Sequence, residues 1–95
     1  MLVIDLHFPD AGSLKGKRKE LSSIKAQLSG RLGVAVAETG YQDLWQRARL
    51  TAALTGGSLR RLAAAADEVE RWIIARCPDG ASVERLVASV EDLRG

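Results

Sequence analysis

The chain has 95 residues, of which 46% are hydrophobic and 27% charged, and its formal net charge is +2. This length suits one small domain with a two-layer core, and no apolar run approaches the roughly 18 residues that a membrane span requires. The net charge is too small to require a nucleic-acid partner, so the placement of the charges matters more than their sum.

The N-terminal segment bears on cellular location, and the numbers of cysteine and histidine residues bear on disulfide and metal binding. Residues 1–10 lack a basic region, and their apolar stretch contains Asp5 and His7, which is typical of a strand rather than a secretory signal. One cysteine and one histidine exclude an internal disulfide and a spaced Cys/His metal cluster. We therefore expect a single cytoplasmic domain over residues 1–95, with no metal and no membrane association.

The first half of the chain predicts strand, helix and strand. Residues 2–8 alternate at the period of a half-buried strand. Ser13 is a suitable N-cap for a helix that runs to about Leu32, and Gly33 suits the end of that helix. The β-favouring residues 34–39 then predict a second strand.

The second half of the chain again predicts a strand, a helix and a strand. Residues 45–54 alternate as a third strand, and Ser58 is the N-cap of a second helix that ends near Cys77. Residues 81–93 alternate again as a long last strand. In that strand we expect Leu86, Ala88 and Val90 on one face, and Arg85, Val87, Ser89 and Glu91 on the other.

The element order βαββαβ predicts an α+β domain, the ferredoxin-like plait. The first two strands are joined by a helical crossover, so they must be parallel and connected right-handedly. In this plait the antiparallel four-stranded sheet has the order 4-1-3-2, and both helices cover one face. The opposite face, called the open face below, is available to solvent, a partner or another subunit.

Three segments also resemble a known family. They are SLKGKRK at 13–19, VAVAE at 34–38 and QDLWQRA at 42–48, and the match covers nearly the whole chain. They resemble the YlxP-like family of small bacterial proteins of unknown function. The resemblance implies a ferredoxin-like fold. It also implies a link to ribosomes, because genes of this family frequently neighbour those of translation initiation factor 2 and ribosome-binding factor A. The chain departs from the family pattern at Gly16, where an acidic residue is common, and in the turn at 40–41.

The start of the first helix carries a dense group of cations. Cations at this end oppose the helix dipole by about 0.3 to 1 kcal/mol per charge, so stability alone would not favour them. With the Ser13 hydroxyl they suit a phosphate or an RNA backbone. A solvated basic turn without a ligand and a small-anion site are the alternatives. The cations of this basic segment are Lys15, Lys17, Arg18 and Lys19.

The predicted topology brings a second polar group together on the open face. Because the first strand is antiparallel to the third and fourth, His7 should lie near Arg47 and Arg49. Arg85 should approach from the fourth strand, and Asp5 should pair with one of the two arginines. The alternative is a surface network of ion pairs worth about 0 to 1 kcal/mol each.

The positions of the aromatic residues and the lack of catalytic motifs bear on which functions the sequence favours. The first and third strands place no aromatic side chain on the open face, which disfavours the base stacking of RNA-recognition plaits. Tyr41 and Trp45 in the intervening hairpin could stack on bases, although we expect Trp45 to close one end of the core. Acylphosphatases share this topology but use an asparagine, and this chain contains none. No nucleotide loop or nucleophile–base pair is apparent, so we expect no enzyme activity and no cofactor.

The sequence therefore predicts a noncatalytic accessory protein. It would bind structured RNA or the ribosome through the basic segment, aided by Arg47 and Arg49. The alternative is a self-associating ligand-sensing or scaffolding domain. In that case the open face or a strand edge forms a homodimer, and the basic segment binds a small anion.

Overall fold

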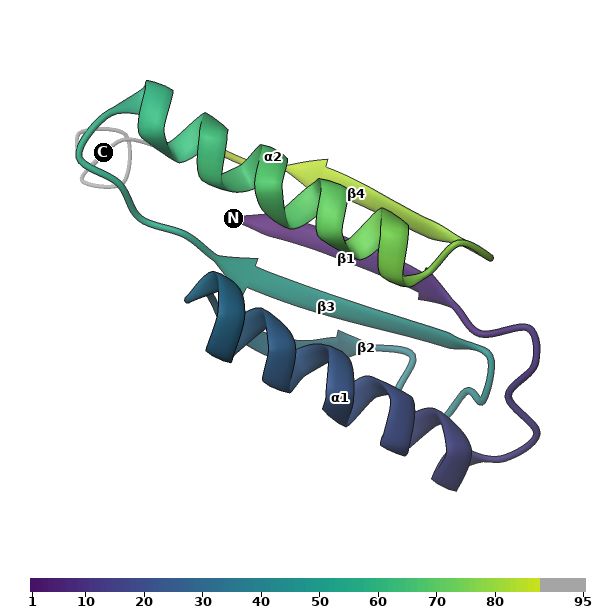
Figure 1. The fold of residues 1–95 in the computed structure, drawn as a ribbon. Coiled ribbons are helices and arrows are strands. Elements are labelled where there is room, and N and C mark those ends of the chain that lie inside the picture. The colour runs from purple at the N-terminus through teal and green to yellow at the C-terminus, as the bar shows by residue number, and fades with distance from the viewer. Residues whose placement is uncertain (88–95) are drawn as a thin grey trace.

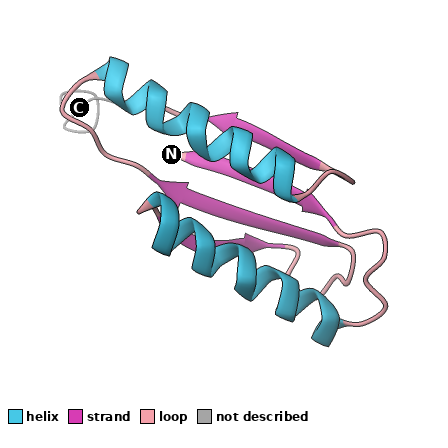
Figure 2. Cartoon of the chain, viewed as in Figure 1, coloured by secondary structure: helices cyan, strands magenta, loops and turns pink. Residues whose placement is uncertain are grey.

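The computed structural model describes residues 1–87, and residues 88–95 lie outside the described part. The elements are β1 (Leu2–His7), α1 (Leu14–Leu32), β2 (Ala35–Gly40), β3 (Arg47–Ala53), α2 (Leu59–Arg76) and β4 (Ala81–Arg85). The strands form one sheet in the order β2-β3-β1-β4, and both helices cover the same face of it (Figures 1 and 2). The predicted ferredoxin-like α+β architecture is confirmed. Neither helix within residues 1–87 is long and apolar enough to cross a membrane.

Strand β1 lies inside the sheet, with antiparallel β3 on one side and antiparallel β4 on the other. Its alternation follows the predicted pattern, because Leu2, Ile4 and Leu6 are buried while His7 is exposed on the opposite face. Ile4 pairs with Leu50 across one ladder, so two fully buried side chains meet at the centre of the sheet. Each such side chain stabilises the fold by about 1.5 to 3 kcal/mol through burial.

The helices complete the core by placing one apolar stripe each against the sheet. Residues three and four positions apart lie on one side of a helix, so these stripes face the strands. The buried stripe residues are Leu21, Ile24 and Leu28 on α1 and Ala66, Val69 and Ile73 on α2.

Capping explains where the helices begin and end. The Ser13 Oγ accepts a hydrogen bond from the Gly16 amide at 3.0 Å, and the Ser58 Oγ accepts one from the Arg61 amide at 3.2 Å. Both predicted N-caps are therefore confirmed. Gly33 ends α1 with a φ of 67°, in the left-handed region that favours glycine.

The last strand differs from its prediction. Strand β4 ends at Arg85, with Leu86 and Val87 beyond it, whereas an alternating pattern over residues 81–93 predicted a longer strand. The predicted faces of residues 88–91, which are Ala88, Ser89, Val90 and Glu91, lie outside the described residues.

The faces of β4 are also reversed relative to the prediction. Val83 pairs with Ile4 and packs against the core, so it fixes which side chains of β4 point inward. Arg85 lies two residues further along the strand and therefore on the same side as Val83. Its side chain faces α2 rather than the open face, because a one-residue error in parity moves every side chain to the other face. Arg85 also pairs with Leu2, at the opposite end of β1 from His7, so the prediction of Arg85 beside His7 is wrong.

Gly30 and Gly33 offer a matched test of the assigned end of α1. A Cβ added at either position would meet nothing within 4 Å, so the two positions differ in backbone conformation rather than in space. Gly33→Ala should lower the free energy of unfolding by about 1 to 2 kcal/mol, because alanine is strained at this φ. Gly30→Ala should raise it by about 0.5 to 1 kcal/mol, because Gly30 is helical. Urea unfolding followed by circular dichroism measures both, and shifts of the same sign would contradict this helix end.

Candidate functional site

Helix α1 is strongly basic, and its one acidic residue is engaged elsewhere. The only acidic residue among 14–32 is Glu20. Its Oε2 accepts a hydrogen bond from Nη2 of Arg76 on α2 at 2.8 Å, and this contact raises the pKa of Arg76. Glu20 therefore bridges the two helices, and the other cations of α1 gain no carboxylate from their own helix. These basic residues are Lys15, Lys17, Arg18, Lys19, Lys25 and Arg31.

Four of these cations form what we call the basic flank: Lys15, Arg18, Lys19 and Lys25. The first three are exposed, Lys25 is half-buried, and none of the four forms an ion pair within residues 1–87. Steps of three, four and seven residues place them on neighbouring positions of one side of the helix. At a rise of 1.5 Å per residue, Lys15 and Lys25 are about 15 Å apart along the axis. Sequence reasoning missed Lys25 because it considered only the first turns, although its seven-residue step from Arg18 was visible.

Lys17 is separated from the other members of the predicted basic segment. Its side chain is 1% exposed, and its Nζ donates a hydrogen bond to the backbone carbonyl of Tyr41 at 2.5 Å. Position 17 lies one turn before Leu21, on the stripe that packs against the sheet. A buried ammonium group needs such a partner, and it is not accessible to a phosphate in solution.

Ser13 has a structural role in the fold. Its hydroxyl oxygen accepts the capping bond from the Gly16 amide, while its O–H can still donate to a phosphate. The exposed cations of the predicted segment are Lys15, Arg18 and Lys19.

Tyr41 connects α1 to the open face of the sheet. It has a φ of 59°, which is uncommon for a residue other than glycine. Its carbonyl accepts the Lys17 bond, and its ring lies under two guanidinium groups, with the Cζ of Arg47 at 4.5 Å and the Cζ of Arg49 at 5.1 Å from the ring centroid. Cation–π attraction at these distances orients both arginines.

Asp5 forms an ion pair with Arg49, one of the two arginines that the sequence offered as its partner. The Nε of Arg49 lies 2.7 Å from Oδ1 of Asp5, and its Nη2 lies 3.2 Å from Oδ2, so the contact is bidentate. The guanidinium lowers the pKa of Asp5, and the carboxylate in turn raises the pKa of Arg49. The charge of Arg49 is thus compensated, whereas Arg47 forms no ion pair within the described part of the chain.

Arg47 lies between two open hollows near one end of the sheet. It pairs with His7 across the β1–β3 ladder, as the topology predicted. One hollow, of about 520 Å³, is lined by Asp5, Leu6, His7, Arg47, Gly80, Ala81 and Ser82. The other, of about 470 Å³, is lined by Asp43, Leu44, Trp45, Gln46 and Arg47.

Trp45 is exposed in the second hollow, with 53% of its surface accessible, so the expectation that it closes the core is wrong. The loop between β2 and β3 is held instead by its backbone and by Gln46. The Phe8 amide donates to the Gln46 carbonyl at 2.7 Å, and the Gln46 Nε2 donates to the Pro9 carbonyl at 3.2 Å. These bonds anchor the loop without help from the indole ring, which stays available to solvent.

Arg85 belongs to a different part of the surface. Its Nη2 lies 2.7 Å from Oδ1 of Asp67 and also contacts Glu70, and both carboxylates raise the pKa of Arg85. The predicted polar cluster is therefore reduced to Asp5 and His7, which share the open face with Arg47 and Arg49. Within residues 1–87 no group of three or more His, Cys, Asp or Glu side chains is placed to hold a metal ion.

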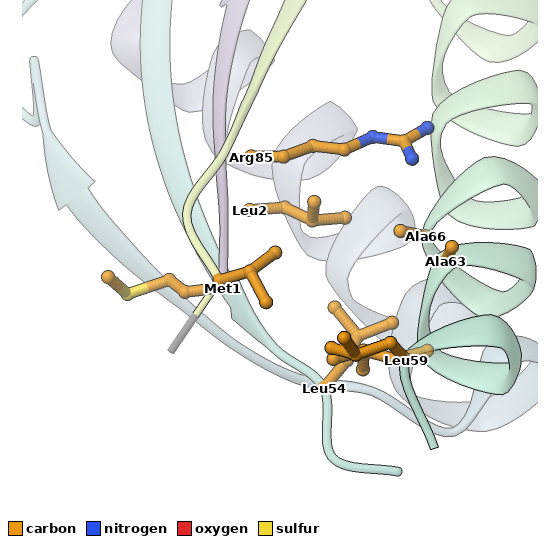
Figure 3. Close-up of a pocket in the computed structure, with 9 residues that line it drawn as sticks. Met1, Leu2, Leu54, Leu59, Ala63, Ala66 and Arg85 are labelled. Carbon is orange, nitrogen blue, oxygen red and sulfur yellow. The ribbon is translucent and has the colours of Figure 1, made fainter. Parts of the chain in front are cut away.

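An apolar hollow of about 250 Å³ lies at the opposite end of the sheet, beside the start of α2 (Figure 3). In Figure 3 Leu54 and Leu59 lie at the lower side of the hollow, and Leu2 and Ala66 lie on opposite sides above them. Leu59 is 73% exposed. The full lining is Met1, Leu2, Leu54, Leu59, Leu62, Ala63, Ala66, Arg85 and Val87.

The different environments of Lys17 and Lys15 predict different effects of the same substitution. Lys17→Ala should lower the free energy of unfolding by about 1 to 3 kcal/mol, because it removes a buried side chain and one of the two hydrogen bonds that the Tyr41 carbonyl accepts. Lys15→Ala should change it by less than about 0.5 kcal/mol, because this side chain is exposed. Chemical unfolding of both variants measures the difference, and equal stabilities would contradict a structural role for Lys17.

Comparison with known proteins agrees with the resemblance found in the sequence. A family model described as "Protein of unknown function (DUF503)" matches residues 1–92. The chain is also similar to "Uncharacterized protein YlxP" of Bacillus subtilis (strain 168), with 39% identity over 74 residues that cover 67% of this chain and 80% of the relative. Neither description names an activity. Because this family model matches nearly the whole length of the chain, the chain belongs to the DUF503 family.

Proposed function

We propose that the protein is a noncatalytic cytoplasmic accessory factor that binds RNA, free or in the ribosome, through phosphate contacts along α1. The observation that supports this proposal is the basic flank, whose cations have no carboxylate partner within residues 1–87. Their spacing over about 15 Å of helix suits a chain of phosphates better than a single small anion.

The repulsion within the basic flank explains why a polyanion would bind there. Lys15 and Lys19 are four residues apart, and like charges at this spacing destabilise a helix by a few tenths of a kcal/mol. The first-turn cations also oppose the helix dipole. A phosphate backbone relieves both effects and releases its own counterions, which gives a binding free energy that depends strongly on salt.

The noncatalytic part of the proposal is supported by the state of the nucleophile and base candidates. Burial raises the pKa of the Cys77 thiol, so it stays protonated and unreactive. The Asp5 carboxylate is held by Arg49 in a bidentate ion pair, which disfavours its use as a general base.

The proposal predicts that single substitutions in the basic flank reduce the salt dependence of RNA binding. Lys15→Ala, Arg18→Ala and Lys25→Ala should each lower the magnitude of the log–log salt slope by about 1, because each removes one phosphate contact. Arg60→Ala and Arg61→Ala are matched controls, since both residues are exposed on α2 and carry the same charge. Fluorescence anisotropy with a labelled RNA hairpin over a series of KCl concentrations measures the slopes. Equal slopes for α1 and α2 variants would mean that only net charge matters, and would contradict this interface.

A self-associating scaffold, whose basic flank binds a small anion, is the second candidate, because apolar side chains are exposed around the hollow beside α2. Leu59 is 73% exposed, Val87 63% and Met1 48%, and clustered exposure of this kind often marks an interface. A second copy of the chain would bury these side chains in a contact that responds weakly to salt.

If this candidate is correct, Leu59→Glu should convert a dimer to a monomer in analytical ultracentrifugation, because it places a charge in an apolar contact. Ile74→Glu is the control, since Ile74 is half exposed on α2 and does not line the hollow. A monomeric wild-type protein at high concentration, or a dimer that survives Leu59→Glu, would contradict self-association through this surface.

A further inference from the structure

The loop between β2 and β3 presents a large aromatic side chain to solvent at a fixed position. Trp45 is 53% exposed and Leu44 is 47% exposed, and both line the same hollow. Indole rings are well buried on average in folded proteins, and an exposed apolar side chain within a hollow is typical of a binding site. The Leu44 amide donates to the Tyr41 carbonyl at 3.1 Å, which together with the bonds of Gln46 restrains the loop.

Arg47 adds a cation next to this ring. Its guanidinium rests on the Tyr41 ring, which orients it, and it has no carboxylate partner among the described residues. An oriented guanidinium without an internal partner is well suited to bind a phosphate in a bidentate manner. Because Arg47 lines both hollows, one ligand can pass from the Trp45 hollow over Arg47 to the hollow beside His7.

The two hollows differ in the groups that line them, so each suits a different part of a nucleotide. Asp43 lines the Trp45 hollow, where a carboxylate can accept a hydrogen bond from a ribose 2′-hydroxyl but would repel a phosphate. In the other hollow the Asp5 charge is compensated by Arg49, while His7 and the Ser82 hydroxyl supply polar groups. Volumes of about 470 and 520 Å³ are within the usual range of small-ligand sites.

We propose that Trp45, Arg47 and His7 form a track for single-stranded RNA. A base stacks on Trp45, the adjoining phosphate lies on Arg47, and the next nucleotide occupies the hollow of His7 and Ser82. This inference rests on the proposed function and specifies its substrate class, because bases within a duplex are already stacked and cannot lie against a side chain. The paired phosphates of a duplex would contact only the basic flank.

Binding of a labelled short single-stranded RNA and of a blunt-ended RNA duplex with the same number of phosphates tests this track. Trp45→Ala should weaken binding of the single strand by about 5- to 150-fold, the effect of losing one stacked base. It should leave the affinity for the duplex and both salt slopes unchanged, because no charge is removed. Arg47→Ala should instead lower the salt slope for the single strand by about 1. Trp45→Tyr should retain most of the affinity, and Ile74→Ala is the control for loss of an exposed apolar side chain.

A direct readout uses the fluorescence of the ring itself. In a Trp72→Phe background Trp45 is the one remaining tryptophan, since the chain has two. Its emission should be quenched by the single strand and not by the blunt-ended duplex, because only an unpaired base can stack on it.

The outcomes separate this inference from the proposed function. If Trp45→Ala binds the single strand like the wild type, the track is refuted, although the basic flank can still bind RNA. If Trp45→Ala loses binding while the basic flank variants do not, the track is supported and the α1 interface fails. If the wild type binds neither RNA at low salt, both proposals fail together.

Discussion

The hydrogen bond from Lys17 to the Tyr41 carbonyl is the contact on which the arrangement of this surface depends. A buried ammonium group must be hydrogen-bonded, and here its acceptor comes from the loop that follows β2. Tyr41 thereby keeps its left-handed backbone, and its ring positions Arg47 and Arg49. Helix α1, the loop and the open face are thus joined through one residue.

Two sets of cations in this protein differ in whether they have partners within the fold. Lys17, Arg49, Arg76 and Arg85 bind groups of the protein itself, and each of their contacts joins two elements of the fold or an element and a loop. The basic flank and Arg47 have no such partner within residues 1–87. A net charge of +2 therefore understates how much uncompensated positive charge one end of the molecule presents.

Local patterns were enough to predict most of the fold. The two-residue alternation of β1 and β3, the apolar stripes of the helices and the capping serines Ser13 and Ser58 each act within a few neighbouring residues. The last strand was predicted less well, because its apolar residues fit either parity. Val83 determined the parity by pairing with Ile4, a contact made across the sheet rather than along the chain.

By itself, the sequence determined the order of the elements, the strand order that follows from it, the pairing of Asp5 with an arginine of the third strand and the presence of a basic first helix, because each follows from spacing along the chain. Only the tertiary structure decided which charges and rings are available to a ligand. Lys17 was hidden, Trp45 was left exposed and Arg85 was turned toward α2. The reason is that exposure depends on what a distant segment places against a side chain. Helical spacing puts Lys17 on the buried stripe, but only the fold supplies the carbonyl that makes its burial possible.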